Sequence, residues 1–207
     1  MGRPAYFIRT FGCPVKCPWC DSAGTWHPDW IPESVDRISE LELANRAALT
    51  KAEFAVITGG EPAIHDLSDL TEELSARHIP SHLETSGAFV LNGNFSWITL
   101  SPKWAKLPLP MNLESANEIK IIVEEPRSIE LWWAKLSRHV TNQIVWLHPE
   151  WSKRNDPLIL ESISRAVKDT GKPFRAGYQL HRLYNVDALD SNSRPNVPLG
   201  GDLTLGY

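Results

Sequence analysis

The sequence predicts an α/β fold in which parallel strands alternate with helices and form an incomplete barrel. Two observations support this prediction. Short apolar segments with strand character alternate with amphipathic segments of helical spacing, as in a series of βα units. Almost every predicted strand also ends in a cluster of polar residues, and such ends share one mouth when a parallel sheet curls. At 207 residues the chain is long enough for one such domain.

The predicted elements follow one another in βα order. Buried strands are expected at 5–10, 54–57, 81–84, 97–100, 117–123, 143–147 and 174–180. Helices are expected at 39–51, 67–78, 128–138 and 157–170. Ser39 is a candidate N-cap because Glu42 follows three residues later. We assign residues 1–186 to the barrel and 187–207, rich in Pro, Gly, Asn and Asp, to an irregular tail of the same domain.

Composition and charge exclude several functions. The net charge is −4, and Lys and Arg are scattered, so we expect no nucleic-acid partner. No apolar run is long enough to cross a membrane and the first residues lack the apolar core of a signal peptide, so we expect no membrane association. The sequence therefore predicts a cytoplasmic protein, in a compartment where thiols stay reduced.

All three cysteines lie directly after the first predicted strand. Cys13, Cys17 and Cys20 form a C-x3-C-x2-C array. Three thiolates this close in sequence can converge on one face of a loop, as they do around iron–sulfur clusters. A four-iron cluster needs four ligands, so three cysteines leave one iron open to chelate the amino and carboxylate groups of S-adenosylmethionine.

Two other interpretations of the array are open at this level. A zinc site would need a fourth ligand, for which His27 is the nearest imidazole. A disulfide would leave one thiol unpaired.

The turn after the second strand is a further candidate site. In Thr58-Gly59-Gly60-Glu61-Pro62 the two glycines let the backbone approach a ligand closely. The carboxylate of Glu61 is suited to the ammonium group of an amino acid. This turn and the array, with Trp19 just before its last cysteine, resemble the two motifs of the radical SAM superfamily, in which the aromatic residue lies beside the adenine.

A longer series of motifs resembles one family within that superfamily, the 7-carboxy-7-deazaguanine synthases. The series is FIRTFGCPVKCPWCDSAGTW, VITGGEPAIHDLSDL, LETSG, WITLSPK, ANEIK and YQLHRLYNV, and the match spans about residues 2–186. The resemblance implies a homodimeric enzyme on an abbreviated TIM-like barrel that receives electrons from a donor such as flavodoxin. Such an enzyme converts 6-carboxy-5,6,7,8-tetrahydropterin to 7-carboxy-7-deazaguanine with loss of ammonia, for queuosine and other 7-deazapurines, and depends on magnesium.

The resemblance also implies roles for individual residues. Cys13, Cys17 and Cys20 would ligate a [4Fe–4S] cluster, and Ser22 would coordinate Mg²⁺. The implied contacts with S-adenosylmethionine are Trp19, Asp21, Gly59, Gly60, Glu61, Ser86, Ser101, Pro102, Lys103 and His148. The implied substrate residues are Arg9, Thr58, Glu84 and His181, with Arg9 suited to the substrate carboxylate. Glu84 and Lys103 are the candidate catalytic residues.

The sequence departs from the family pattern in two places. The usual Gln-Gly-Glu-Gly segment, which touches the substrate, is not found, so either translation starts further upstream or the pocket is completed otherwise, for which the tail is a candidate. His148-Pro149 also stands where relatives tend to have Gln-Pro. Two alternative functions are an activase of a glycyl radical enzyme and, from a different class, a zinc-binding interaction module.

Overall fold

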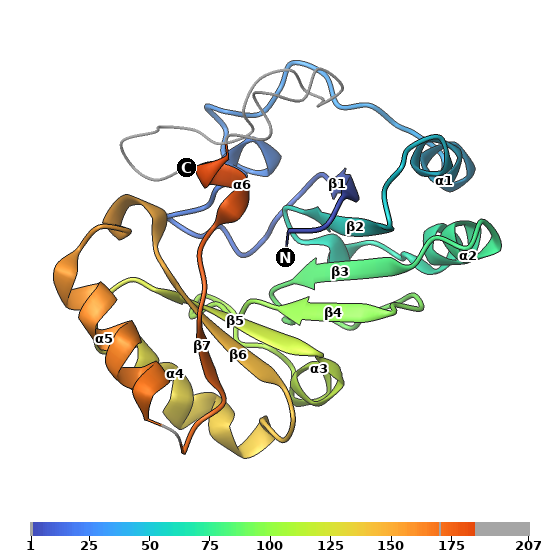
Figure 1. The fold of residues 1–207 in the computed structure, drawn as a ribbon. Coiled ribbons are helices and arrows are strands. Elements are labelled where there is room, and N and C mark those ends of the chain that lie inside the picture. The colour runs from blue at the N-terminus through green and yellow to red at the C-terminus, as the bar shows by residue number, and fades with distance from the viewer. Residues whose placement is uncertain (1, 170, 185–207) are drawn as a thin grey trace.

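The computed structural model describes residues 2–169 and 171–184, which contain a seven-stranded sheet (Figure 1). The strands are β1 (Ala5–Thr10), β2 (Phe54–Gly59), β3 (Ser81–Thr85), β4 (Trp97–Leu100), β5 (Glu118–Val123), β6 (Ile144–Pro149) and β7 (Phe174–Ala176). They pair in sequence order, and each pairing is parallel. Within the described ranges no ladder joins β7 to β1, so the sheet is an open, partial barrel, and the predicted fold class is confirmed.

The helices lie mainly on the outside of this curved sheet (Figure 1). They are α1 (Glu40–Ala48), α2 (Ser68–Ala76), α3 (Pro110–Ser115), α4 (Ser128–Leu136), α5 (Pro157–Lys168) and α6 (Leu180–Leu183). Short 3₁₀ helices span Ala23–Thr25, Pro62–Ile64, Ser137–His139 and Trp151–Lys153. Unlike the other helices, α6 lies at the carboxyl ends of the strands, beside the loop that follows β1 (Figure 1).

Local capping explains where the predicted helices begin. The Ser39 hydroxyl accepts a hydrogen bond from the Glu42 N–H at 3.3 Å, which confirms the predicted N-cap of α1. At α5, Asp156 caps the Leu158 N–H at 2.9 Å, and Pro157 fits the first helical turn. The helix α3 was not predicted, because it spans only six residues and offers too short a period to detect.

Two apolar clusters fill the space between the sheet and its outer helices. One joins β1, β2 and β3 to α1 and α2, and the other joins β4 to β7 with α3, α4 and α5. Ile57, Leu83, Leu100, Ile119 and Leu147 are fully buried at these contacts. Because side chains alternate along a strand, the residues between them face the inside of the curved sheet. The outward face therefore stabilises the fold and leaves the inward face for function.

The last predicted strand is shorter than expected. The strand β7 ends at Ala176, and the residues around His181 form α6 instead of a strand. The Gly177 N–H still bonds the Leu147 carbonyl at 3.0 Å, but the next ladder bond would need an N–H at residue 149. Pro149 has none, so pairing stops there and the chain turns across the mouth of the barrel. The predicted tail at 187–207 lies outside the described residues.

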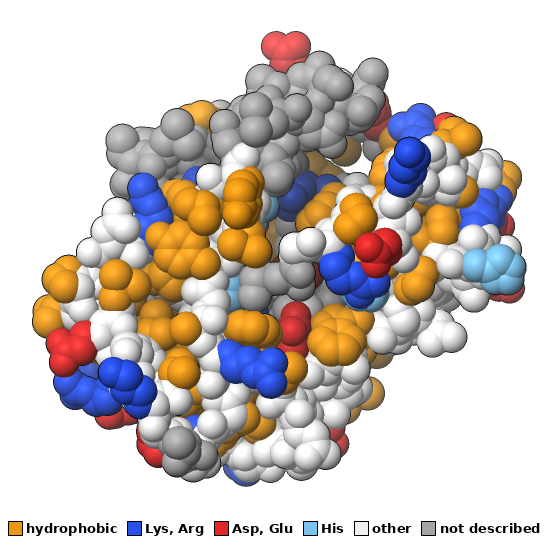
Figure 2. Space-filling view, in the orientation of Figure 1, with side chains coloured by type: hydrophobic (Ala, Val, Ile, Leu, Met, Phe, Trp, Pro, Cys, Tyr) orange, Lys and Arg blue, Asp and Glu red, His pale blue; other side chains and the backbone are white. Residues whose placement is uncertain are grey.

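The surface of the described residues carries charges of both signs. On the face in Figure 2, Lys and Arg side chains are interspersed with Asp and Glu, and hydrophobic side chains gather over α5 and the adjacent β7. Leu158 and Leu160 of α5 are 64% and 42% exposed. No helix in the described ranges has the length and apolar character needed to cross a membrane.

Candidate active site at the mouth of the half-barrel

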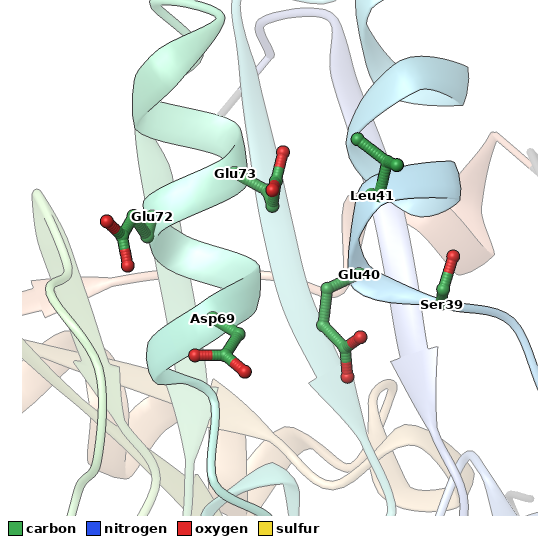
Figure 3. A pocket seen from close by; sticks show the side chains of 6 residues that line it. All are labelled: Ser39, Glu40, Leu41, Asp69, Glu72 and Glu73. Atoms are coloured by element: carbon green, nitrogen blue, oxygen red, sulfur yellow. The ribbon is translucent and has the colours of Figure 1, made fainter.

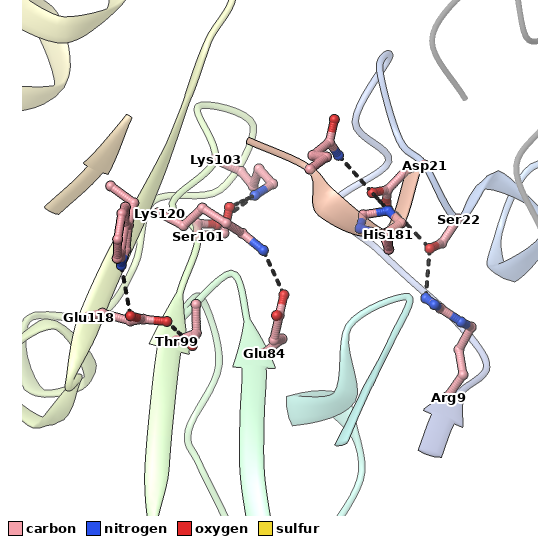
Figure 4. Close-up of polar contacts among 12 residues, drawn as sticks. Arg9, Asp21, Ser22, Glu84, Thr99, Ser101, Lys103, Glu118, Lys120 and His181 are labelled. Carbon is pink, nitrogen blue, oxygen red and sulfur yellow. Dashed lines mark hydrogen bonds and ion pairs between the residues drawn. The ribbon is translucent and has the colours of Figure 1, made fainter. Parts of the chain in front are cut away.

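Polar side chains from separate elements meet inside the curved sheet (Figure 4). Strand register places Arg9 beside Thr58 and Glu84 beside Thr99. Further along the sheet, the inward-facing residues of β5 and β6 include Lys120 and His148. The sequence thus correctly predicted that polar groups at the ends of parallel strands would share one mouth.

The three thiols lie in the loop that enters this mouth after β1. All are unpaired, so the disulfide interpretation is wrong for this structure. Burial, opposed by Lys103 and aided by the nearby Cys20 and Cys13, raises the pKa of the Cys17 thiol to about 12. Burial also raises the pKa of the Cys20 thiol, so these two thiols stay protonated until a metal centre displaces their protons. The residues present therefore fit an iron–sulfur cluster.

A single zinc ion fits the same loop poorly. His27, the candidate fourth ligand, accepts a hydrogen bond from the Asp29 N–H at its Nδ1, 3.3 Å away. Among the described residues no three Cys, His, Asp or Glu side chains converge on a point that would hold one ion. Zinc needs such convergence, because each of its ligands lies within ~2.3 Å of the metal.

The glycine turn after β2 packs directly on the cysteine loop. A Cβ at Gly60 would lie 2.3 Å from the Gly12 carbonyl oxygen and 2.8 Å from the Cys13 Cβ. Gly59 has φ +149°, and a Cβ there would lie 2.3 Å from the Thr10 carbonyl oxygen. Only glycine permits this approach, so the two motifs predicted to bind one cofactor are held against each other.

The Glu61 carboxylate organises this turn from within the protein. It is 1% exposed and accepts hydrogen bonds from the Thr85 hydroxyl at 2.6 Å and the Ala63 N–H at 3.0 Å. Its other oxygen accepts from the Ser86 N–H at 2.8 Å and from the Ser86 hydroxyl. Because both oxygens are engaged, the carboxylate and Ser86 clamp the ends of β2 and β3 together. Their contact with S-adenosylmethionine stays a prediction.

The Ser101-Pro102-Lys103 turn after β4 also reaches the cysteine loop. The Lys103 ammonium lies 5.2 Å from the centre of the Trp19 ring and donates to the Ser101 carbonyl and hydroxyl at 2.7 and 2.6 Å. Burial lowers the pKa of Lys103, and Cys17 opposes that shift. The structure thus brings together these residues, all predicted from the sequence to bind the cofactor or the cluster.

A second polar chain crosses the mouth from β1 to α6. Arg9 donates to the Ser22 hydroxyl at 2.7 Å, and that hydroxyl lies 3.4 Å from Asp21. Asp21 also accepts from Gln179 at 3.0 Å and pairs with His181 at 3.5 Å. Burial alone would raise the pKa of Asp21, but its hydrogen bond and ion pair with His181, aided by Arg9, hold that pKa well below its usual range. The early end of β7 makes this contact possible.

Sequence reasoning missed Lys120, which pairs with a residue that it did find. The Lys120 ammonium donates to Glu84 at 2.6 Å (Figure 4). Burial would raise the pKa of Glu84, but the charge and hydrogen bond of Lys120 outweigh it and lower that pKa. The signal was present in the sequence, since Glu118 and Lys120 alternate with isoleucines in a buried strand. Two charges at that spacing must share the inward face.

His148 has an unusual environment at the end of β6. The side chain is 5% exposed, and its Nδ1 is buried without a hydrogen-bond partner in the part of the chain that the structure describes. A Cβ at Gly177 would lie 2.1 Å from its Nε2, so the ring rests against the Gly177 backbone. Burial lowers the pKa of His148 to about 3, with Lys120 adding to the shift. The ring is therefore neutral at physiological pH.

This burial predicts a pH dependence of stability. The pKa of His148 is about 3 in the folded state and about 6.5 in the unfolded state. The unfolded chain thus binds more protons between these values, and stability falls as the pH drops below 6.5. We expect a loss of about 1 kcal/mol from pH 8 to pH 6 that is absent in His148→Gln, measured by urea unfolding of both proteins. An equal dependence of the free energy of unfolding on pH in the two proteins would contradict the low pKa of His148 in the folded state.

A separate pocket lies on the outer surface between α1 and α2 (Figure 3). Its volume is about 360 Å³, and it is lined by Ser39, Glu40, Leu41, Asp69, Glu72 and Glu73. No basic side chain lines it, and none of the predicted site residues reaches it. The candidate site therefore lies in the mouth and not in this pocket.

An open parallel barrel whose mouth gathers a loop of three free thiols, a glycine turn and a charged interior is the architecture of an α/β enzyme, and its thiols fit a metal-cluster cofactor. Comparisons with known proteins identify its family, although no family model matches the chain. The chain is 43% identical over 152 residues to the 7-carboxy-7-deazaguanine synthase of Synechocystis, covering 72% of this chain and 70% of that protein. It is 36% identical over 191 residues to that of Flavobacterium psychrophilum, covering 89% of this chain and 84% of that protein.

The crystal structure of QueE from Escherichia coli superposes on this chain with a TM-score of 0.70 at 32% identity, covering 86% of both chains. The chain belongs to the 7-carboxy-7-deazaguanine synthase family.

Proposed function

We propose that this chain converts 6-carboxy-5,6,7,8-tetrahydropterin to 7-carboxy-7-deazaguanine with loss of ammonia, as a radical SAM enzyme of 7-deazapurine biosynthesis. The observation that carries the proposal is the convergence of the thiol loop with a charged interior in a chain of this family. Cys13, Cys17 and Cys20 would hold a [4Fe–4S] cluster. Together with S-adenosylmethionine, that cluster supplies the carbon radical.

The protein's own contribution is to hold the substrate in position. Arg9 presents a planar guanidinium to the substrate carboxylate, and Glu84 accepts a hydrogen bond from the pterin ring. Glu84 suits that role because its lowered pKa keeps it ionised at neutral pH. Thr58 and His181 border the same space from β2 and α6. Lys103 and Trp19 would flank the adenosine at the cluster side.

Magnesium is a further part of the proposal. In the structure the Ser22 hydroxyl is engaged by Arg9 at 2.7 Å. With Arg9 turned to the substrate carboxylate, the Ser22 hydroxyl would be available as a hard oxygen ligand for Mg²⁺. Turnover should then depend on magnesium, which omission of the ion tests directly.

We also propose a cytoplasmic homodimer that receives electrons from a donor such as flavodoxin. An apolar groove along the edge strand β7 offers a surface for a second copy, with Leu160, Ile163 and Val167 of α5 and Tyr178 in its lining. Light scattering of the cluster-loaded protein tests the dimer, and a monomer at all concentrations would refute it. Reduction of the cluster by purified flavodoxin tests the donor.

Substrate binding without turnover separates this proposal from the activase alternative. Cluster-loaded protein with S-adenosylmethionine but no reductant should bind 6-carboxytetrahydropterin in calorimetry. Glu84→Gln should weaken that binding about tenfold or more, because a charged acceptor is lost. Glu161→Gln, at an exposed ion pair on α5, is the matched control and should bind normally. An activase would not bind the pterin at all, and equal binding by wild type and Glu84→Gln would refute the role of Glu84.

A further inference from the structure

We propose that Lys120 is a specificity-determining residue that, together with Glu84, recognises the C4 carbonyl and N3–H edge of the pterin ring. This inference rests on the proposed function, since it names the part of the substrate that this pair contacts.

The position of Lys120 places it where a ligand in the barrel would lie. It is in the middle of β5 on the inward face, opposite Trp146 in the register of β5 and β6. Its ammonium crosses to β3 and donates to one Glu84 oxygen at 2.6 Å. In Figure 4 both side chains point from their strands toward the shared interior, between Ser101 and the Asp21 loop.

Both members of the pair keep hydrogen-bonding capacity for a ligand. An ammonium has three donors, and within the described residues Lys120 uses one of them. The second Glu84 oxygen has no hydrogen-bond partner among those residues. The Lys120 side chain is 23% exposed and that of Glu84 is 40% exposed, so the free ends are accessible from the open interior. A pair that served only the fold would not need open donors and acceptors there.

Neighbouring groups do not take up this capacity. Glu118, the other carboxylate on the inward face of β5, accepts from the Thr99 hydroxyl at 2.8 Å and the Trp146 indole at 2.8 Å. It is therefore directed away from Lys120 toward β4 and β6. Lys120 and Glu84 thus keep free donors and a free acceptor side by side.

This donor and acceptor match one edge of a pterin. In the 2-amino-4-oxo ring, the C4 carbonyl accepts a hydrogen bond and the adjacent N3–H donates one. The Lys120 ammonium can donate to that carbonyl while the free Glu84 oxygen accepts from N3–H. A 4-amino analogue reverses both groups, because its amino group donates and its N3 accepts. A site that hydrogen-bonds a polar edge rejects analogues that lack the complementary groups, because the donors and acceptors of the site are then left unpaired.

The test compares binding of the two ligand types. Cluster-loaded protein with S-adenosylmethionine and no reductant is titrated with 6-carboxytetrahydropterin and with its 4-amino counterpart. We expect the wild type to favour the 4-oxo ligand by about tenfold or more. Lys120→Met should lose about tenfold for the 4-oxo ligand and little for the 4-amino ligand, so that the preference nearly disappears. Lys120→Arg should keep the preference, and Lys135→Met, at an exposed site on α4, is the control.

The outcomes separate the inference from the function on which it rests. Equal weakening of both ligands by Lys120→Met, or an unchanged preference, would overturn the role of Lys120 while leaving the function in place. Failure of the wild type to bind the 4-oxo ligand would overturn the proposed function itself. If Lys120→Met does not fold, the double variant Glu84→Gln/Lys120→Met leaves no charge unpaired, and comparing its ligand preference with that of Glu84→Gln isolates the contribution of Lys120.

Discussion

Replacing any one of Cys13, Cys17 or Cys20 with serine is expected to abolish the iron–sulfur cluster and all turnover. The array supplies three thiolates, and the described chain offers no fourth thiol to replace a lost one. A serine hydroxyl is a poor substitute because its oxygen is a hard ligand that stays protonated at neutral pH. Iron and sulfide content, visible absorbance and product formation measure the loss after anaerobic reconstitution.

Folding provides the control for the cysteine variants. Cys17 is buried, whereas Cys13 and Cys20 are partly exposed, so serine at the latter two positions should leave the metal-free protein as stable as the metal-free wild type. A serine variant that kept a full complement of iron and sulfide together with normal turnover would contradict the assignment of that cysteine as a ligand.

Glu61→Ala is expected to cost about 3 kcal/mol of stability, the largest effect on folding among these predictions. Truncation leaves the Ser86 N–H, the Ala63 N–H and the Thr85 hydroxyl without their acceptor in a site from which water is excluded. Glu61→Gln keeps one acceptor oxygen and should reduce the stability less than Glu61→Ala. Some stability is still lost, because the amide NH₂ group then faces hydrogen-bond donors instead of accepting from them. Urea unfolding of the metal-free proteins measures both effects.

A surface variant shows whether the effect of Glu61 is specific. Glu161→Gln removes a carboxylate of α5 that is 63% exposed, and such changes usually stay within about 0.5 kcal/mol. If Glu61→Ala were as mild as this control, the clamp between β2 and β3 would not be a determinant of the fold.

Much of the architecture could be predicted because local sequence and global fold agree. The segment 5–10 carries aromatic and β-branched residues, and β1 has those bounds. Ser39 and Glu42 likewise mark the start of α1. The cysteines could be assigned to one loop because they lie close together in the chain. Two consecutive glycines predict a close approach of the backbone to a neighbouring group, whatever the rest of the fold.

What the sequence could not provide depends on contacts between distant elements. The strand at 174–180 ends early because of Pro149 on a different strand, a constraint visible only once the register is known. The carboxylate of Glu61 is predicted to contact a ligand, but the sequence could not show its hydrogen-bond partners on β3 and in the residues after it, more than twenty positions along the chain. The pair of Lys120 with Glu84 spans three strands in the same way.

The central claim is that the mouth performs radical chemistry on a pterin, and one measurement tests it most directly. The protein is reconstituted anaerobically with iron and sulfide, then incubated with a reductant, S-adenosylmethionine, Mg²⁺ and 6-carboxy-5,6,7,8-tetrahydropterin, and the products are analysed by mass spectrometry. We predict 7-carboxy-7-deazaguanine, formed only when all components are present. Formation of 5′-deoxyadenosine without any deazaguanine product would contradict the substrate, and the absence of both would contradict the radical chemistry.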